Sequence, residues 1–196
     1  MIPCTIQEIC AAVGGTLLQD SPAAITGVTT DSRAVSAGQL FIPLTGERFD
    51  GHTYIDAALT GGAEGCLTAR RPDKLLPHKA YVLVEDTRRV YSQLCAAFFG
   101  YPARKMQLLA LTGTNGKTTS AWMLHHALGH LGIKAGLIGT ICNRIGESLT
   151  LPARYTTPDA WELQQLLAMM FKQGCTHVVM EASSQAIEQQ RLYGCQ

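Results

Sequence analysis

The chain has 196 residues, of which 46% are hydrophobic, so it is long enough to form one large or two small domains around real hydrophobic cores. Sixteen Lys and Arg against fifteen Asp and Glu leave a net charge of +1, which excludes strong attraction to nucleic acid or to an anionic membrane. The seven scattered cysteines are typical of reduced thiols, and no apolar run approaches the roughly 18 residues of a membrane span. Because the amino terminus also lacks signal-peptide features, the sequence predicts a cytoplasmic protein with no nucleic-acid or membrane partner, and we expect a monomer.

The first hundred residues alternate short helices and strands. Thr5 to Glu8 have the pattern of a capping box, which predicts a helix that ends near Gly14. A second helix is expected over residues 54–59, and a third is expected to be capped by Thr87 and to end at Gly100. Runs of β-branched and apolar residues predict strands over 25–30, 39–44, 65–68 and 80–84. Residues 1–102 are therefore predicted to form a small α/β domain.

Gly100-Tyr101-Pro102 marks a predicted domain boundary, after which the elements become longer. Apolar strands separated by helices indicate a doubly wound parallel sheet over residues 103–196, of which only three strands are expected to be present. A hairpin is expected between the second and third of these strands. The predicted strands cover 106–112, 135–141 and 176–180, the helices 117–131 and 159–172, and the hairpin 142–151.

A glycine-containing loop joins the first of these strands to the first helix. Its sequence from Thr112 to Thr119 is T-G-T-N-G-K-T-T, and its backbone N–H groups and the helix amino terminus suit phosphate. Lys117 is expected to reach the β- and γ-phosphates of ATP, and the Thr118 hydroxyl to bind Mg²⁺. The loop is shorter than the usual phosphate loop, because Leu111 stands where the first glycine is expected. The predicted nucleotide-binding residues are Gly113, Thr114, Asn115, Gly116, Lys117, Thr118 and Thr119.

Glu181 ends the last predicted strand. In a parallel sheet this carboxylate emerges at the same edge as the loop, where it could bind Mg²⁺, but a helix cap is an equal alternative. The sequence has no Asn-Lys-x-Asp segment, which excludes a typical GTPase, while a simple kinase stays possible on the loop alone. His125 and His126 in the helix after the loop are interpreted as satisfied or solvated histidines and not as ligands.

Several separated motifs together resemble the Mur ligases, and within them the UDP-N-acetylmuramoyl-tripeptide synthetase branch. Thr114 and the Thr-Thr-Pro segment favour this branch over its neighbours. The resemblance extends from about Thr5 to the end of the chain. The motifs are Thr30 to Arg33, Gly38 to Phe41, Gly46 to His52, Thr112 to Thr119, Thr156 to Asp159 and Glu181 to Arg191.

The resemblance implies an ATP-dependent ligase of peptidoglycan synthesis. Such an enzyme phosphorylates the D-glutamate carboxylate of UDP-MurNAc-L-Ala-D-Glu to an acyl phosphate, and the amine of a diamino acid, diaminopimelate or lysine, displaces the phosphate. A carboxylate is a poor acyl donor until it is phosphorylated, so Lys117, as a catalytic residue, and Mg²⁺ would neutralise the charge that builds on the γ-phosphoryl group.

The resemblance also implies roles for particular residues. Thr118 and Glu181 would hold Mg²⁺. The uridine end of the substrate would contact Thr30, Ser32, Glu47, Arg48 and Phe49, with Arg33 as a further candidate, and the diphosphate and muramoyl part would contact Thr156, Thr157, Ser183, Gln189 and Arg191.

Some of these residues have plain structural alternatives. Asp31 to Arg33 fit a surface turn held by an Asx hydrogen bond, and Thr157 with Pro158 fits a helix N-cap. Arg191 could be a solvated surface residue. Gln189 and Arg191 are two residues apart, so a regular helix would point them to different sides; either the helix is irregular there or only one reaches a ligand.

Three positions depart from the usual family pattern. Gln185 stands where histidine is common, Tyr155 where a polar residue is usual, and Pro43 where a small residue is usual; Pro43 is therefore expected at a strand end. We also expect that these residues alone do not ligate, because the family's later metal-binding region, carbamylated lysine and carboxy-terminal domain have no counterpart in them. The alternatives are another ligase of the Mur and folylpolyglutamate group, or a non-catalytic nucleotide-binding fragment.

Overall fold

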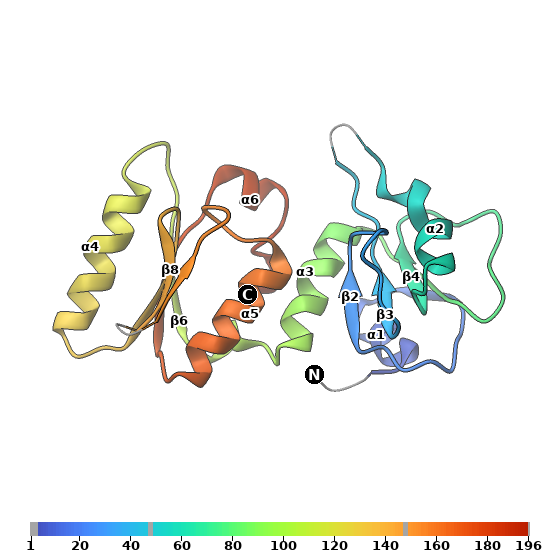
Figure 1. Cartoon of the computed structure of the whole chain (residues 1–196), viewed down its shortest axis with the longest axis horizontal. Helices are drawn as coiled ribbons and strands as arrows, with labels where there is room; N and C mark the ends of the chain where they lie inside the picture. Colours follow the sequence, from blue (N-terminus) through green and yellow to red (C-terminus); the bar gives the residue numbers. More distant parts are fainter. Residues whose placement is uncertain (1–3, 47–48, 147–148, 196) are drawn as a thin grey trace. The chain divides into compact units, whose positions relative to one another are not determined.

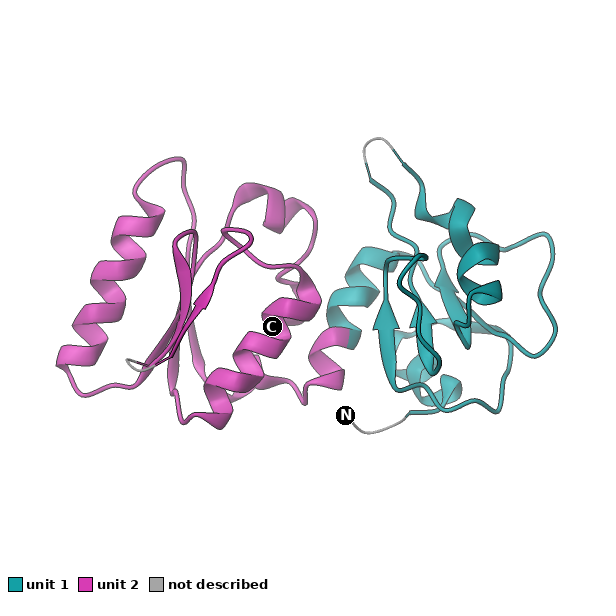
Figure 2. Ribbon diagram, viewed as in Figure 1, with its two compact units in different colours: residues 1–94 teal, residues 95–196 magenta. Residues whose placement is uncertain are grey.

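The computed structural model of the chain describes residues 4–46, 49–146 and 149–195 and consists of two compact units, Met1–Leu94 and Cys95–Gln196 (Figure 2). The division falls inside helix α3 (Thr87–Phe98), slightly before the boundary predicted at Pro102. No helix in the described ranges is long and apolar enough to cross a membrane.

Unit 1 contains a five-stranded sheet with the order β1-β5-β4-β3-β2. Strands β2 to β5 are parallel, and β1 pairs antiparallel with β5. The predicted strands are confirmed, β4 with the same bounds and the other three with shorter ones, whereas β1 was not predicted because its sequence Thr-Leu-Leu-Gln shows no alternation. Pro43 lies beyond the end of β3, as expected. The bounds are β1 Thr16–Gln19, β2 Gly27–Thr29, β3 Gln39–Phe41, β4 Gly65–Thr68 and β5 Ala80–Leu83.

The helices of unit 1 follow the predicted caps with one correction. Helix α1 (Ile6–Val13) has the capping box between Thr5 and Glu8, and it ends at Gly14, whose φ of 64° is left-handed. A 3₁₀ turn, η1 (Gly51–Tyr54), precedes α2 (Ile55–Thr60). The cap of α3 is Asp86 and not Thr87, because Asp86 Oδ1 accepts from the backbone N–H groups of Arg88 and Arg89.

Unit 2 contains a second five-stranded sheet, with the order β6-β10-β7-β8-β9. Strand β10 is parallel to both β6 and β7, while β8 and β9 form the expected hairpin. The hairpin pairs antiparallel with β7, so the expectation of only three strands is wrong. The strand bounds are β6 Gln107–Leu111, β7 Ala135–Ile138, β8 Cys142–Ile145, β9 Leu149–Pro152 and β10 His177–Glu181.

Helices cover both faces of this sheet (Figure 1). Along β10, Val179 packs in the cluster beneath α4 (Lys117–His130), while its neighbours Val178 and Met180 pack in the cluster beneath α5 (Ala160–Lys172). Alternating side chains of a strand point to opposite faces, so this central strand is buried by two layers of helix. This arrangement confirms the predicted doubly wound α/β class. The remaining elements of unit 2 are η2 Pro102–Lys105, α6 Ser184–Glu188 and η3 Tyr193–Cys195.

Candidate functional site

The loop between β6 and α4 has the backbone that its glycines predict. Gly113 has a φ of 142° and Gly116 a φ of 80°, both in the region that favours glycine. Gly116 is the N-cap of α4 and carries no capping side chain, so the first N–H groups of the helix face the exposed loop. Helix N–H groups without an intrahelical partner form a ready site for an anion.

Lys117 is the first residue of α4, and its ammonium group folds back over the loop. Its Nζ donates to the carbonyl of Gly113 at 2.6 Å and lies 3.5 Å from that of Thr114. The cation is thus held at the loop by weak acceptors, which an incoming phosphate oxygen could replace with a stronger, charge-assisted hydrogen bond.

Glu181 lies at the carboxyl end of β10 and is only 1% exposed. Its Oε2 accepts from the hydroxyls of Thr118 at 2.8 Å and Thr140 at 3.1 Å, and its Oε1 accepts from the Thr140 N–H at 2.9 Å. A Cβ at Gly139 would come up against the Glu181 Oε1, so a larger residue there would force the carboxylate to shift. Glu181 does not cap α6, because Ser183 does so by accepting from the Ala186 N–H.

The pair of Thr118 and Glu181 fits a magnesium ion. Carboxylate and hydroxyl oxygens are hard ligands that suit Mg²⁺. The donors around the carboxylate are two hydroxyls and one backbone N–H, which solvate its charge without neutralising it. In the part of the chain that the structure describes, no group of three or more His, Cys, Asp or Glu could hold a metal. The ion would therefore take its other ligands from water and phosphate.

Thr157 is buried and ties its segment to the end of β10, and it does not cap a helix. It is 1% exposed, its hydroxyl donates to the Glu181 carbonyl at 2.7 Å, and it accepts from the Ser183 N–H at 3.0 Å. The N-cap of α5 is Asp159, so the N-cap alternative for Thr157 is wrong. The Thr156 hydroxyl lies 3.1 Å from the Thr140 hydroxyl and donates to it, since Thr140 gives its own hydrogen to the carboxylate; this links Thr156 to the carboxylate site.

Gln189 and Arg191 come together because the helix before them is irregular. Helix α6 ends at Glu188, and Gln190 adopts a left-handed φ of 55°. Arg191 donates through Nε and Nη2 to the Gln189 Oε1 at 3.0 and 2.7 Å, and through Nη1 to the Thr157 carbonyl at 2.9 Å. Arg191 is therefore a positioned, partly buried cation, and the first of the two alternatives for this segment holds.

The predicted uridine contacts in unit 1 lie on the loops after β2 and β3. Thr30 and Ser32 are partly buried, and Phe49 is 60% exposed; Glu47 and Arg48 lie outside the described residues. The Asx turn is present, since Asp31 Oδ1 accepts from the Arg33 N–H at 3.0 Å. The Arg33 guanidinium, which donates to the same carboxylate, lowers the pKa of Asp31 to about 2.

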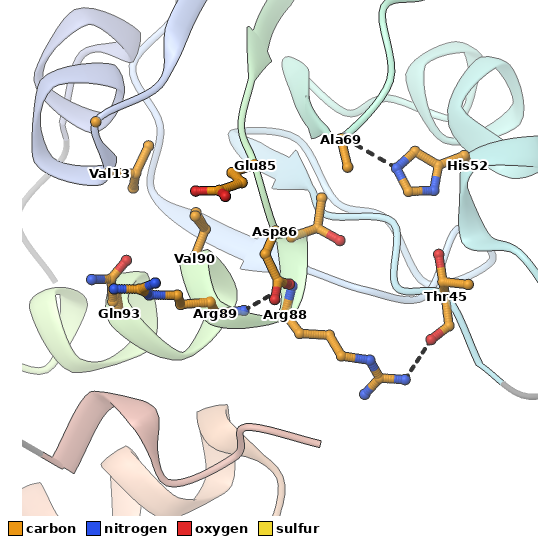
Figure 3. A pocket seen from close by; sticks show the side chains of 12 residues that line it. Val13, Thr45, His52, Ala69, Glu85, Asp86, Arg88, Arg89, Val90 and Gln93 are labelled. Atoms are coloured by element: carbon orange, nitrogen blue, oxygen red, sulfur yellow. Dashed lines mark hydrogen bonds between the residues drawn. The ribbon is translucent and has the colours of Figure 1, made fainter. Parts of the chain in front are cut away.

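A cavity of about 610 Å³ opens in the same unit beside the end of β4 and the first turn of α3 (Figure 3). Its lining includes Thr45, His52 and Arg88, but not Thr30, Ser32 or Phe49. The sequence did not predict this cavity. Of its lining residues, only His52 belonged to a motif singled out in the sequence.

His52 in this cavity has a defined hydrogen-bond pattern. Its Nδ1 lies 2.7 Å from Asp50 Oδ1, and its Nε2 accepts from the Ala69 N–H at 3.1 Å, which assigns the proton to Nδ1. The backbone N–H and ring of His52 lower the pKa of Asp50 to about 2. The Asp50 carboxylate also pairs with Arg70 at 2.7 Å. These contacts fix the end of the Gly46 to Asp50 turn against β4.

The strand, loop and helix of unit 2, with a buried carboxylate at the end of the adjacent parallel strand, define a nucleotide-binding domain of the phosphate-loop class. Comparison with known families agrees with this class. The family model for the Mur ligase middle domain matches residues 111–196, and that for the Mur ligase family, catalytic domain, matches residues 24–99.

Similar proteins of known name belong to the same group. The UDP-N-acetylmuramoyl-L-alanyl-D-glutamate--2,6-diaminopimelate ligase of Bacteroides thetaiotaomicron is 42% identical over 175 residues, which cover 89% of this chain and 36% of that protein. The ligase of the same name from Gloeobacter violaceus is 41% identical, covering 87% of this chain and 35% of that protein.

Solved structures show the same fold. A UDP-N-acetylmuramoyl-L-alanyl-D-glutamate--2,6-diaminopimelate ligase superposes with a TM-score of 0.75 at 28% identity, over 99% of this chain and 39% of that one. A UDP-N-acetylmuramoylalanyl-D-glutamyl-2,6-diaminopimelate--D-alanyl-D-alanyl ligase from Acinetobacter baumannii gives a TM-score of 0.61 at 26% identity, over 94% and 37%. This chain belongs to the Mur ligase family. It spans about a third of the length of the curated relatives it matches.

Proposed function

We propose that the chain carries the ATP-binding and UDP-precursor-binding parts of an ATP-dependent ligase that adds a diamino acid to UDP-MurNAc-L-Ala-D-Glu. The observation that carries the proposal is the 2.8 Å hydrogen bond between the Thr118 hydroxyl and the Glu181 carboxylate. It joins the start of α4 to the end of β10, and it supports a magnesium site at these two oxygen groups beside the exposed N–H groups of the loop.

In the proposed reaction, the loop N–H groups and the Lys117 ammonium hold the phosphates of ATP. Thr118 and Glu181 hold Mg²⁺, which, when bound, neutralises charge on the transferred phosphoryl group. The residues of the chain thus let the substrate carboxylate approach an anionic phosphate. Attack of that carboxylate on the γ-phosphorus releases ADP and gives an acyl phosphate, from which the incoming amine displaces phosphate to form the amide.

Each unit is proposed to contribute substrate contacts of its own. Arg191 offers a partly buried cation to the diphosphate or the sugar, and Thr156 lies one hydrogen bond from Thr140. Thr30, Ser32 and Phe49 would meet the uridine end. The relatives at about 40% identity are named for 2,6-diaminopimelate, so we propose this diamino acid as the one added. Because the proposed reaction uses ATP and a UDP-linked precursor, we propose that it takes place in the cytoplasm.

The proposal is tested by calorimetric titration of the chain with ATP·Mg²⁺ and, separately, with UDP-MurNAc-L-Ala-D-Glu. Both ligands should bind, and Lys117→Ala should weaken ATP binding while leaving the UDP precursor unaffected. Lys172→Ala, which removes an exposed lysine at the end of α5, is the matched control. Binding of ATP without the UDP precursor would favour another ligase of the group, and binding of neither ligand would refute the proposal.

A further inference from the structure

Unit 2 contains a cavity of about 680 Å³, which lies at the end of α4 away from the phosphate loop. It is formed by the last turns of α4, the turn that follows, and β8. The lining side chains that carry chemistry are His125, His126, His130, Lys134 and Arg144; the others are glycines and small or aliphatic residues. Thirteen residues separate Lys117 from His130, which at the helical rise corresponds to about 20 Å. The two sites are therefore distinct.

The charges around this cavity have one sign. Lys134 and Arg144 are cationic, three imidazoles join them, and the described lining contains no Asp or Glu. This is unusual in a chain whose net charge is only +1. A concave surface lined by charges of one sign concentrates ions of the opposite sign.

Three of the lining side chains, Arg144, His126 and His125, form a row with the Trp122 ring, which itself lies outside the lining. The Arg144 guanidinium lies 5.6 Å from the Trp122 ring, and that ring lies 5.7 Å from the His126 ring. His126 in turn meets His125 edge-on at 5.8 Å. His125 is 5% exposed, and its Nε2 is 3.3 Å from the Ala135 carbonyl, which anchors the row to β7. Side chains already held in place lose less conformational entropy when a ligand binds.

The stem of Lys134 lies beside Gly146, the residue that directly follows β8. A Cβ at Gly146 would lie 3.0 Å from the Lys134 Cε, so the stem of the lysine crosses the end of β8 where glycine leaves room. The Lys134 backbone is fixed as well, since its carbonyl accepts from the Thr176 N–H at 3.0 Å. Lys134 is exposed and lines the cavity, so its ammonium group can reach a ligand there.

The carboxyl end of a helix normally repels anions, because its last carbonyls carry partial negative charge. Here those carbonyls are largely occupied. Leu131 and Ile133 donate their N–H groups to the carbonyls of Ala127 and Leu128, and Gly132, with a left-handed φ of 74°, donates to that of Gly129. The remaining dipole effect is opposed by two full positive charges.

We propose that this cavity is a binding site for a small phosphate-bearing anion, separate from the ATP site. His126 and His130 are four residues apart on one helical face, a spacing that also suits a transition metal. However, the third histidine of the lining, His125, is 5% exposed with its Nε2 at the Ala135 carbonyl, and among the described residues no group of three or more His, Cys, Asp or Glu could hold a metal ion. A phosphate group matches the observed combination of a guanidinium, an ammonium and imidazole donors.

The site is tested in the chain that carries Lys117→Ala, so that the loop does not compete. Pyrophosphate, orthophosphate and ribose 5-phosphate are titrated separately while NMR follows the histidine ring and Trp122 indole signals. Saturable shifts at His126, His130 and Trp122 are expected with at least one probe. Inorganic phosphate and ribose 5-phosphate distinguish a free from an esterified phosphate.

Charge variants decide whether the cavity is responsible. Lys134→Gln with Arg144→Gln should weaken binding at least about tenfold, and Lys134→Gln alone should weaken it less. The matched control, Arg154→Gln with Lys172→Gln, removes two exposed cations outside the cavity and should leave the affinity unchanged. An equal loss in the control, no saturable shift, or binding of Zn²⁺ in place of all three phosphates would overturn the proposal. Because the NMR signals and the charge variants report on the cavity and not on the loop, these outcomes are independent of the proposed ligase function.

Discussion

Replacing Glu181 with glutamine tests the magnesium site without removing the side chain. Glutamine has the same shape, so its oxygen can keep the 2.9 Å hydrogen bond from the Thr140 N–H, and the hydroxyls of Thr118 and Thr140 can rotate to accept from the new amide. The substitution changes charge and leaves the packing almost intact. It therefore separates a role in metal binding from a role in folding.

The effect on stability should be small because two contributions oppose each other. Three hydrogen bonds to a charged acceptor, at about 1.5–3 kcal/mol each, become neutral ones at about 0.5–1.5 kcal/mol each, a loss of roughly 3 kcal/mol. Removing the negative charge of this carboxylate, which is 1% exposed, recovers several kcal/mol of desolvation free energy. We expect the free energy of unfolding to change by no more than about 2 kcal/mol.

The effect on nucleotide binding should be large and should depend on magnesium. Loss of one charged ligand is expected to weaken ADP·Mg²⁺ at least about tenfold, or about 1.4 kcal/mol. With EDTA present, ADP alone should bind the wild type and Glu181→Gln equally. Glu188→Gln, at the exposed end of α6, is the matched control and should behave as wild type. Calorimetry that finds the same magnesium dependence in Glu181→Gln and wild type would refute the assignment.

Four further substitutions test the surrounding structure. Thr157→Val removes a buried hydroxyl that donates at 2.7 Å and should cost about 1–3 kcal/mol in chemical denaturation, whereas Thr157→Ser should restore most of it. Gly139→Ala should force the Glu181 carboxylate to move, so ADP·Mg²⁺ binding should be lost even if the melting temperature falls only moderately. Unchanged binding would contradict the close approach between a Cβ at this position and the Glu181 Oε1. Gln190→Gly should raise stability by about 1 kcal/mol, because the left-handed φ of 55° no longer meets a Cβ, and a loss of stability would contradict this account. The pKa of Asp50 is about 2 in the fold against 3.8 ordinarily, so its stabilising effect is complete above about pH 4 and is lost as the pH falls toward 2; Asp50→Asn should flatten the acid unfolding curve in that window.

Much of the architecture could be predicted because its signals are local. The capping box at Thr5 and the glycines of the phosphate loop act within a few residues, and the structure has both. The cap of α3 was misplaced by one residue, because Asp86 and Thr87 both have capping side chains and only the direction of the backbone N–H groups decides between them. The five-stranded sheet was missed because pairing of the hairpin with β7 is a tertiary contact without a local pattern.

The candidate site shows the same limit. Lys117, Thr118 and Glu181 follow from a loop and from a strand that ends in a carboxylate. Thr140 does not, since it meets the carboxylate from the end of β7, 41 positions away in the chain. The sequence raised the irregular segment around Gln189 only as one of two alternatives, because it does not encode the left-handed φ of the next residue in any obvious way.

The register of β10 has a consequence for how the chain can change in length. Glu181 is level with Leu111 of β6, and Met180 is level with Ile138 of β7. Because neighbouring side chains of a strand face opposite ways, deleting one residue inside β10 would present a side chain of the wrong face where the carboxylate stands. The connection between α5 and β10 offers little slack, because Cys175 is buried and the Thr176 N–H donates to the Lys134 carbonyl. Insertions and deletions that persist in homologous chains should therefore spare both β10 and the connection before it.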